Sequence, residues 1–126
     1  MDDSLRTAIS GAIYARSGNM TESEDIWQTG GFLNSPDEMN RLAWLLVTNG
    51  WAAEAEPLAR EAIATNPDPN FRHTLGYALL RQGLAEEALA ELQAAYDGGL
   101  MYGYPEINLD LGEAHLALEN YEDAIA

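Results

Sequence analysis

A small residue returns about once every 33 positions along this chain, each time inside a segment with helical spacing of apolar residues. The recurring residues are Gly11, Ala43, Gly76 and Gly112, at offsets of 32, 33 and 36 residues. Two antiparallel helices can approach closely only where no side chain intervenes, and glycine or alanine opens that space. A period of this length is typical of stacked helix pairs. The spacing therefore predicts an all-α solenoid.

Apolar residues at helical spacing surround these positions. Leucines form the main stripe, and small residues on the following segment supply a matching surface. The stripe consists of Leu42, Leu46, Leu75, Leu79 and Leu111, and the matching small residues are Ser23, Ala55, Ala88 and Ala124. The pattern predicts helices near 4–17, 21–29, 36–49, 52–65, 69–82, 85–97, 105–118 and 121–126.

Glycines and capping residues mark the expected helix ends. A residue with left-handed backbone is favoured just past a helix, and Gly18, Gly50 and Gly83 each follow a first helix. Residues 35–38 (Ser-Pro-Asp-Glu) and 21–24 (Thr-Glu-Ser-Glu) have the order of a capping box. Asp68-Pro69 opens the next pair with proline at the first helical position.

Two stretches of the chain resemble the tetratricopeptide repeat. They are carried by Leu42, Ala43, Leu46, Gly50, Ala55, Ala62, Ile63 and Pro67, and by Leu75, Gly76, Leu79, Gly83, Ala88, Leu92 and Ala95. The resemblance implies a single domain folded as a right-handed α–α superhelix of about three and a half repeats. A degenerate first repeat would occupy 1–35, followed by repeats over 36–68 and 69–104 and a truncated fourth over 105–126.

The two ends of the sequence carry separate expectations. Met1-Asp2-Asp3 is acidic and no long apolar run follows, so we expect neither a secretory leader nor a membrane span, and a cytoplasmic location. The sequence stops at Ala126, about halfway through an expected second helix. This predicts either a shortened chain or a partner that completes the stack.

Acidic residues dominate the charge. Six Lys and Arg residues against 21 Asp and Glu residues give a net charge of −15. Such a surface repels nucleic-acid phosphates and anionic membranes, so we expect no nucleic-acid or membrane partner. The acidity has two interpretations, which are steering of a basic partner, and solubility or a salt-adapted source.

The sequence contains no recognisable reaction centre. There is no cysteine, and the two histidines are too few for a zinc site, which needs three or four converging ligands. No phosphate loop or nucleophile motif is present. We therefore expect no enzyme activity, no metal and no cofactor. His115 is expected to be a partly buried packing residue, and His73 to lie on the inner face.

The resemblance implies that the first helix of each pair lines a concave face that holds extended or helical peptides. On this face the candidate residues are Asn40, Arg41, Trp44, Thr48, Asn70, His73, Tyr77, Arg81 and Glu113. The same face is expected to include Asp37, Thr74, Glu106, Leu109 and Asp110. Trp44 and Tyr77 occupy equivalent places one repeat apart. They favour a peptide anchor, because aromatic side chains supply large contact areas, although filling gaps between adjacent helices is the alternative.

Three functions follow from this sequence. The first is a scaffold that binds a peptide or protein on the concave face, with a basic partner as one alternative. The second is a structural unit in which the incomplete C-terminal repeat mediates homo-oligomerisation. The third is an accessory domain of a larger enzyme or secretion protein.

Overall fold

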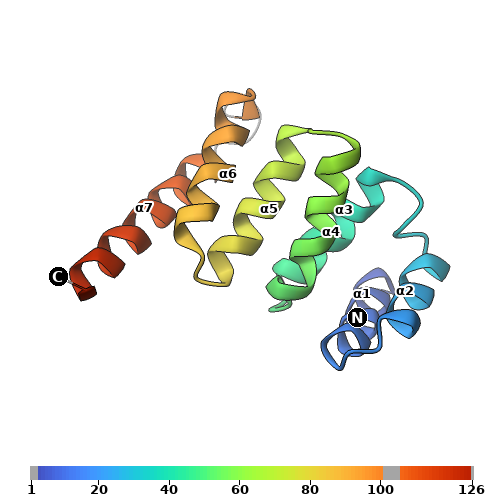
Figure 1. Ribbon diagram of the computed structural model, residues 1–126. Coiled ribbons are helices and arrows are strands. Elements are labelled where there is room, and N and C mark those ends of the chain that lie inside the picture. Colours follow the sequence, from blue (N-terminus) through green and yellow to red (C-terminus); the bar gives the residue numbers. More distant parts are fainter. Residues whose placement is uncertain (1–2, 101–105, 126) are drawn as a thin grey trace.

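The structure is a computed structural model that describes residues 3–100 and 106–125, with side chains described as far as Glu119. Within these ranges the chain forms seven α-helices and no strand. The helices are α1 (Asp3–Arg16), α2 (Met20–Thr29), α3 (Pro36–Val47), α4 (Ala52–Thr65), α5 (Pro69–Arg81), α6 (Ala85–Asp97) and α7 (Glu106–Ile125). Figure 1 shows successive helices side by side, from the α1–α2 hairpin at one end to α7 at the other. The predicted all-α superhelix is confirmed.

Close contact within the helix pairs takes place at the small residues. A β-carbon added to Gly76 on α5 would lie 2.7 Å from Cγ of Leu92 on α6. A β-carbon on Gly11 would overlap the Trp27 ring of α2. Ala43, Ser23, Ala55 and Ala88 have no exposed surface. The small residues therefore set how tightly the hairpins close, as the spacing predicted.

The predicted helix ends are largely confirmed. Gly18, Gly50 and Gly83 have φ values of +89°, +89° and +82°. The Oγ of Ser35 accepts from the N–H of Glu38 at 3.2 Å, and Asp68 accepts from the N–H of Asn70 at 2.8 Å. The capping box predicted at Thr21 is wrong. Asn19 caps α2 instead, and its Oδ1 accepts from the N–H of Glu22 at 3.2 Å.

The largest correction concerns the last two predicted helices. Residues 105–118 and 121–126 were expected to form two helices, but α7 continues as one helix of 20 residues. Glu119 stands where Gly83 stands one repeat earlier, and glutamate favours continuation of a helix. Since α7 does not turn back, Gly112 has no atom within 4 Å of an added β-carbon. The side chain of Ala124, expected to pack opposite it, lies outside the described part.

His115 is also placed differently from the prediction. It was expected to be partly buried, because the family that the chain resembles usually places a bulky core residue at this position, as Leu79 is one repeat earlier. Leu79 on α5 has no exposed surface, whereas His115 is exposed. α5, which carries Leu79, packs against both α6 and α7, whereas α7 is the last helix of the row (Figure 1). His115 is therefore a surface residue.

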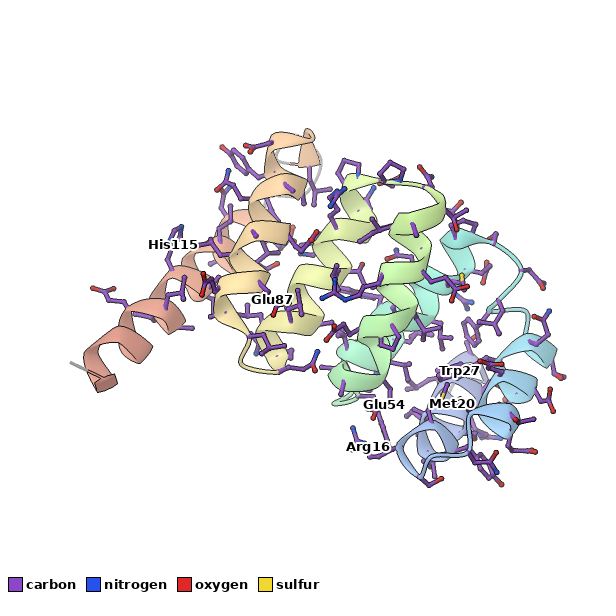
Figure 2. All side chains as sticks on the ribbon, viewed as in Figure 1. Arg16, Met20, Trp27, Glu54, Glu87 and His115 are labelled. Carbon is purple, nitrogen blue, oxygen red and sulfur yellow. The ribbon has the colours of Figure 1, made fainter. Side chains whose placement is uncertain are left out.

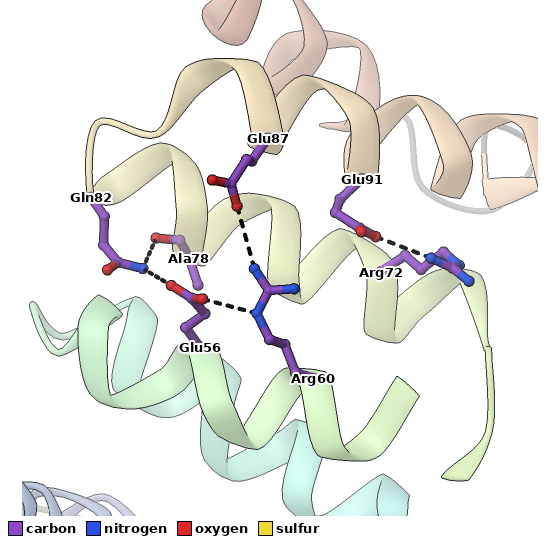
Figure 3. Close-up of polar contacts among 7 residues, drawn as sticks. All are labelled: Glu56, Arg60, Arg72, Ala78, Gln82, Glu87 and Glu91. Carbon is purple, nitrogen blue, oxygen red and sulfur yellow. Dashed lines mark hydrogen bonds and ion pairs between the residues drawn. The ribbon is translucent and has the colours of Figure 1, made fainter. Parts of the chain in front are cut away.

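A polar network ties α4 to α5 and α6 (Figure 3). Arg60 donates to Glu56 at 2.9 Å and to Glu87 at 3.4 Å, while the Gln82 amide donates to Glu56 at 2.9 Å. Burial alone would raise the pKa of Glu56. The hydrogen bonds from Arg60 and Gln82, with the charge of Arg60, outweigh burial and lower the pKa below its ordinary value. A second ion pair joins Arg72 of α5 to Glu91 of α6 at 3.1 Å.

Among the described helices none combines the length and apolar character needed to cross a bilayer.

Candidate functional site

The inner faces of α3 and α5 bring three aromatic rings together. Trp44 comes from α3, and His73 and Tyr77 come from α5, one helical turn apart. The Trp44 ring centroid lies 5.4 Å from that of Tyr77 and 5.6 Å from that of His73. All three rings are tilted relative to one another, which is a favourable geometry for aromatic pairs. Trp44 and Tyr77 are partly exposed, so they present a shared aromatic surface.

His73 supports this surface from below. Only 4% of its surface is exposed, and its Nε2 lies 2.6 Å from Oδ2 of Asp110 on α7. This contact joins two helices of successive repeats across the interior. His73 was predicted to be a binding residue. In the structure it lies between the aromatic pair and Asp110 of α7, and its binding role stays a prediction.

An ion pair borders the aromatic surface on the side of α7. The Cζ of Arg81 lies 4.9 Å from the centroid of the Tyr77 ring, a cation–π contact. Its guanidinium also pairs with the carboxylate of Glu113. The side chain of Arg81 is 39% exposed and that of Glu113 is 50% exposed. Both charges are accessible, and a ligand carboxylate or ammonium could exchange with either partner.

Asn40 lies one helical turn before Trp44 on α3 and is partly buried. Its Oδ1 is enclosed by protein and has no hydrogen-bond donor among the described residues. A buried carbonyl without a donor costs about 1–3 kcal/mol.

Three other predicted residues have local roles. Arg41 donates to Glu38 at 3.2 Å and to Ser4 of α1 at 2.8 Å, so it faces the first hairpin. Thr48 donates to the carbonyl of Trp44 at 2.8 Å, at the end of α3. Asn70 belongs to the cap of α5, through a 3.1 Å hydrogen bond from its amide to Asp68.

The other residues expected on the concave face also differ in their burial and contacts. Thr74 is buried and donates to the carbonyl of Asn70 at 3.1 Å. Asp37, Glu106 and Leu109 are exposed. The residues that come together on the inner face are thus Asn40, Trp44, His73, Tyr77, Arg81, Asp110 and Glu113.

Sequence reasoning missed two partnerships. Asp110 was placed on the inner face without its contact to His73. The guanidinium of Arg16 lies 4.0 Å from the ring centroid of Trp51 and pairs with Glu54, which joins α1 to α4. Both contacts join residues more than 30 positions apart in the chain. A repeat pattern aligns equivalent residues but does not indicate which unlike residues meet, so no local signal could have revealed them.

Comparison with known proteins gives one result. A family model described as a tetratricopeptide repeat matches residues 40–99 and again residues 73–126. The two ranges together span most of the chain and begin inside α3, after the first hairpin. No curated protein and no solved structure matches the chain significantly.

Proposed function

Because this chain belongs to the tetratricopeptide repeat family, whose members generally mediate protein–protein interaction, we propose that it binds a peptide or protein segment on its concave face. The family is typically a non-catalytic interaction module. The proposed contact surface consists of Asn40, Trp44, Tyr77, Arg81 and Glu113. His73 and Asp110 support it from within.

The observation that carries this proposal is the Trp44–Tyr77 pair. Two large rings from neighbouring repeats lie 5.4 Å apart and both are partly exposed. Aromatic side chains dominate the binding energy of many interfaces because each removes a large apolar area from water. His73, which is 4% exposed, lies 5.6 Å from Trp44 and 6.4 Å from Tyr77 between ring centroids, and contacts that order the rings before binding would reduce the conformational entropy lost on binding.

Net charge adds a preference for the partner. The chain carries 21 acidic against 6 basic side chains, so a basic segment would be attracted over long range and a nucleic acid repelled. This attraction acts on the rate of association more than on affinity. The proposed ligand is therefore a basic peptide or protein segment with at least one bulky apolar side chain for the aromatic pair.

A selection experiment tests the proposal. Random peptides displayed on phage would be selected against the chain, and the affinity of the enriched synthetic peptides would be measured by calorimetry. We expect Trp44→Ala with Tyr77→Ala to weaken binding by at least tenfold, or about 1.4 kcal/mol. The matched control is Ile13→Ala with Tyr14→Ala, which removes two side chains of α1 that are 53% and 40% exposed. Equal affinity of the Trp44/Tyr77 variant and the parent would refute the proposal, provided that both have native circular dichroism.

One observation favours a second function, which is self-association through α7. Leu109 and Leu116 are 75% and 56% exposed, on the helix face that also carries Gly112. The equivalent residues one repeat earlier, His73 and Leu80, are only 4% and 8% exposed. This face of α7 is therefore built like one that is covered elsewhere in the fold. Sedimentation equilibrium over a range of protein concentrations tests whether a second copy covers it. We expect a dimer that Leu109→Gln with Leu116→Gln abolishes, and a parent chain that stays monomeric throughout would exclude this function.

A further inference from the structure

A cavity of about 490 Å³ opens between the first hairpin and the second, and it shares no lining residue with the proposed contact surface. Its apolar lining comes from α1, α2, the connection after α2, and the helices α3 and α4. The largest apolar lining residues are Met20, Trp27, Leu33, Met39 and Leu58, and Ala15, Ala53 and Pro57 complete the apolar lining. Trp27, Met39 and Leu58 are buried, whereas Met20 is 46% exposed and lies at the mouth. Figure 2 shows Met20 and Trp27 on α2 close to Glu54 of α4, which also lines the cavity.

The cavity exists because the first hairpin stacks differently from the others. α4 packs against α5 and α6 packs against α7, whereas α2 makes no comparable contact with α3 among the described residues. α2 has only 10 residues against 14 in α4, and residues 30–35 separate it from α3. Phe32, in this connection, is 1% exposed and fills part of the gap. The rest of the space stays open.

Specific contacts fix the positions of the helices that line the cavity. The indole N–H of Trp27 donates to the carbonyl of Ala8 at 3.1 Å, and Gly11 lies against the same ring. Arg16 of α1 donates to both carboxylate oxygens of Glu54 on α4, at 3.1 and 2.6 Å. The Trp27 contacts fix α2 on α1, and the Arg16 contact fixes α1 against α4. A preformed apolar cavity of this size is characteristic of sites for small organic ligands.

The charge at the cavity has one sign. Its charged lining residues are Glu24, Glu54 and Glu61, and no basic side chain lines it. Glu54 is engaged by Arg16. Glu24 and Glu61 have no ion-pair partner among the described residues, and both are exposed. Two unengaged carboxylates beside an apolar cavity favour a ligand that is apolar at one end and positively charged at the other.

We propose that this cavity binds a small organic cation, with an apolar body the size of a ring or short alkyl chain and an ammonium or guanidinium head. The body would pack against Trp27, Leu33 and Leu58, and the head would pair with the carboxylates of Glu24 and Glu61. Met20 and Met39 adapt to the shape of the ligand, because methionine is unbranched and flexible. The site is separate from the proposed peptide surface and does not depend on it.

Three probes with one alkyl chain and different heads test the proposal. Octylammonium, octanoate and octanol would be titrated separately into the full chain labelled with ¹³C at the methionine methyl groups. The chain has only four methionines, so the spectrum resolves each methyl group, and two of them line the cavity. We expect saturable shifts of the Met20 and Met39 signals and of the Trp27 indole N–H. Octylammonium should bind about tenfold more tightly than octanol, the combined effect of two exposed ion pairs, and octanoate more weakly than either.

Two charge variants separate local recognition from the general negative field. Glu24→Gln with Glu61→Gln should remove the preference for octylammonium over octanol and leave octanol binding unchanged. Glu86→Gln with Glu119→Gln alters two exposed residues of α6 and α7 and changes the net charge equally, so it should keep the preference. The proposal is overturned if no probe shifts the Met20 and Met39 signals saturably, if octanoate binds as tightly as octylammonium, or if both variants lose the preference to the same extent.

Discussion

At the scale of single residues, Gly76 and Gly112 are equivalent positions at which substitution by alanine should have opposite effects on stability. Each lies in the middle of a first helix, 36 positions apart. Gly76→Ala places a methyl group 2.7 Å from Leu92, which is fully buried, so the hairpin must open. Overpacking costs about 1–3 kcal/mol, and the higher helix propensity of alanine offsets up to ~1 kcal/mol. We expect a net loss of about 1–2 kcal/mol in the free energy of unfolding.

Gly112→Ala should stabilise the chain. No atom of the described residues lies within 4 Å of the added methyl group, so only the helix propensity changes, by up to ~1 kcal/mol in favour of alanine. Urea unfolding followed by circular dichroism measures both variants under the same conditions. A destabilised Gly112→Ala variant would mean that another surface covers this face of α7 in solution.

Glu56 makes stability depend on pH through its lowered pKa. A carboxylate whose pKa is lower in the folded state stabilises the fold above its unfolded pKa, and this contribution is lost as pH falls through the folded pKa. Glu56→Gln should therefore be less stable than the parent at neutral pH. The difference should shrink below the ordinary carboxyl pKa of about 4.3 and vanish in stronger acid. Thermal unfolding of both proteins across this pH range measures the effect, and a gap of constant size would contradict it.

At this scale the sequence predicted the roles of residues that act through their size or their backbone conformation. It did not predict the roles of residues that act through a partner distant in the chain. Gly18, Gly50 and Gly83 were correctly expected to have a positive φ, because a helix stop is a local feature. Of the predicted site residues, Trp44 and Tyr77 lie together because equivalent positions of adjacent repeats are neighbours in any stack. His73 was predicted to face a ligand and is buried against Asp110, a contact that the repeat pattern does not encode.

At the scale of elements, α7 shows that one residue decides whether a helix ends or continues. The first helices α3 and α5 end just before Gly50 and Gly83, whereas α7 has Glu119 at the equivalent position and continues. The prediction of a turn here relied on the repeat period and overlooked the missing glycine. Glycine has a low helix propensity and readily adopts a positive φ, whereas glutamate favours a continuous helix.

Glu119→Gly should therefore shorten α7. We expect residues after position 119 to lose their helical Cα chemical shifts and their protection from amide hydrogen exchange, because the glycine weakens the helix by about 1 kcal/mol. Glu119→Ala removes the same charge and keeps helix propensity, so it serves as the control. If helical shifts beyond residue 119 persist in the glycine variant, tertiary contacts rather than local propensity maintain this helix.

At the scale of the whole molecule, net charge competes with the ion pairs that join the helices. Bridges such as Arg16–Glu54 and Arg72–Glu91 join helices across the stack, and salt weakens them. Exposed pairs of this kind contribute about 0–1 kcal/mol each. Against them stands the mutual repulsion of a chain with a net charge of −15. This repulsion acts between all carboxylates within a Debye length, which falls from about 30 Å at 0.01 M salt to about 10 Å at 0.1 M.

Repulsion should win this competition, because the six basic residues can engage only a minority of the 21 acidic ones. We therefore expect the melting temperature to rise as sodium chloride is increased between those two concentrations. Glu86→Gln with Glu119→Gln lowers the net charge without removing a described ion pair, so its melting temperature should rise less over the same range. A melting temperature that falls with salt in the parent would show that the bridges between hairpins dominate, and that the stack is held together by its few arginines.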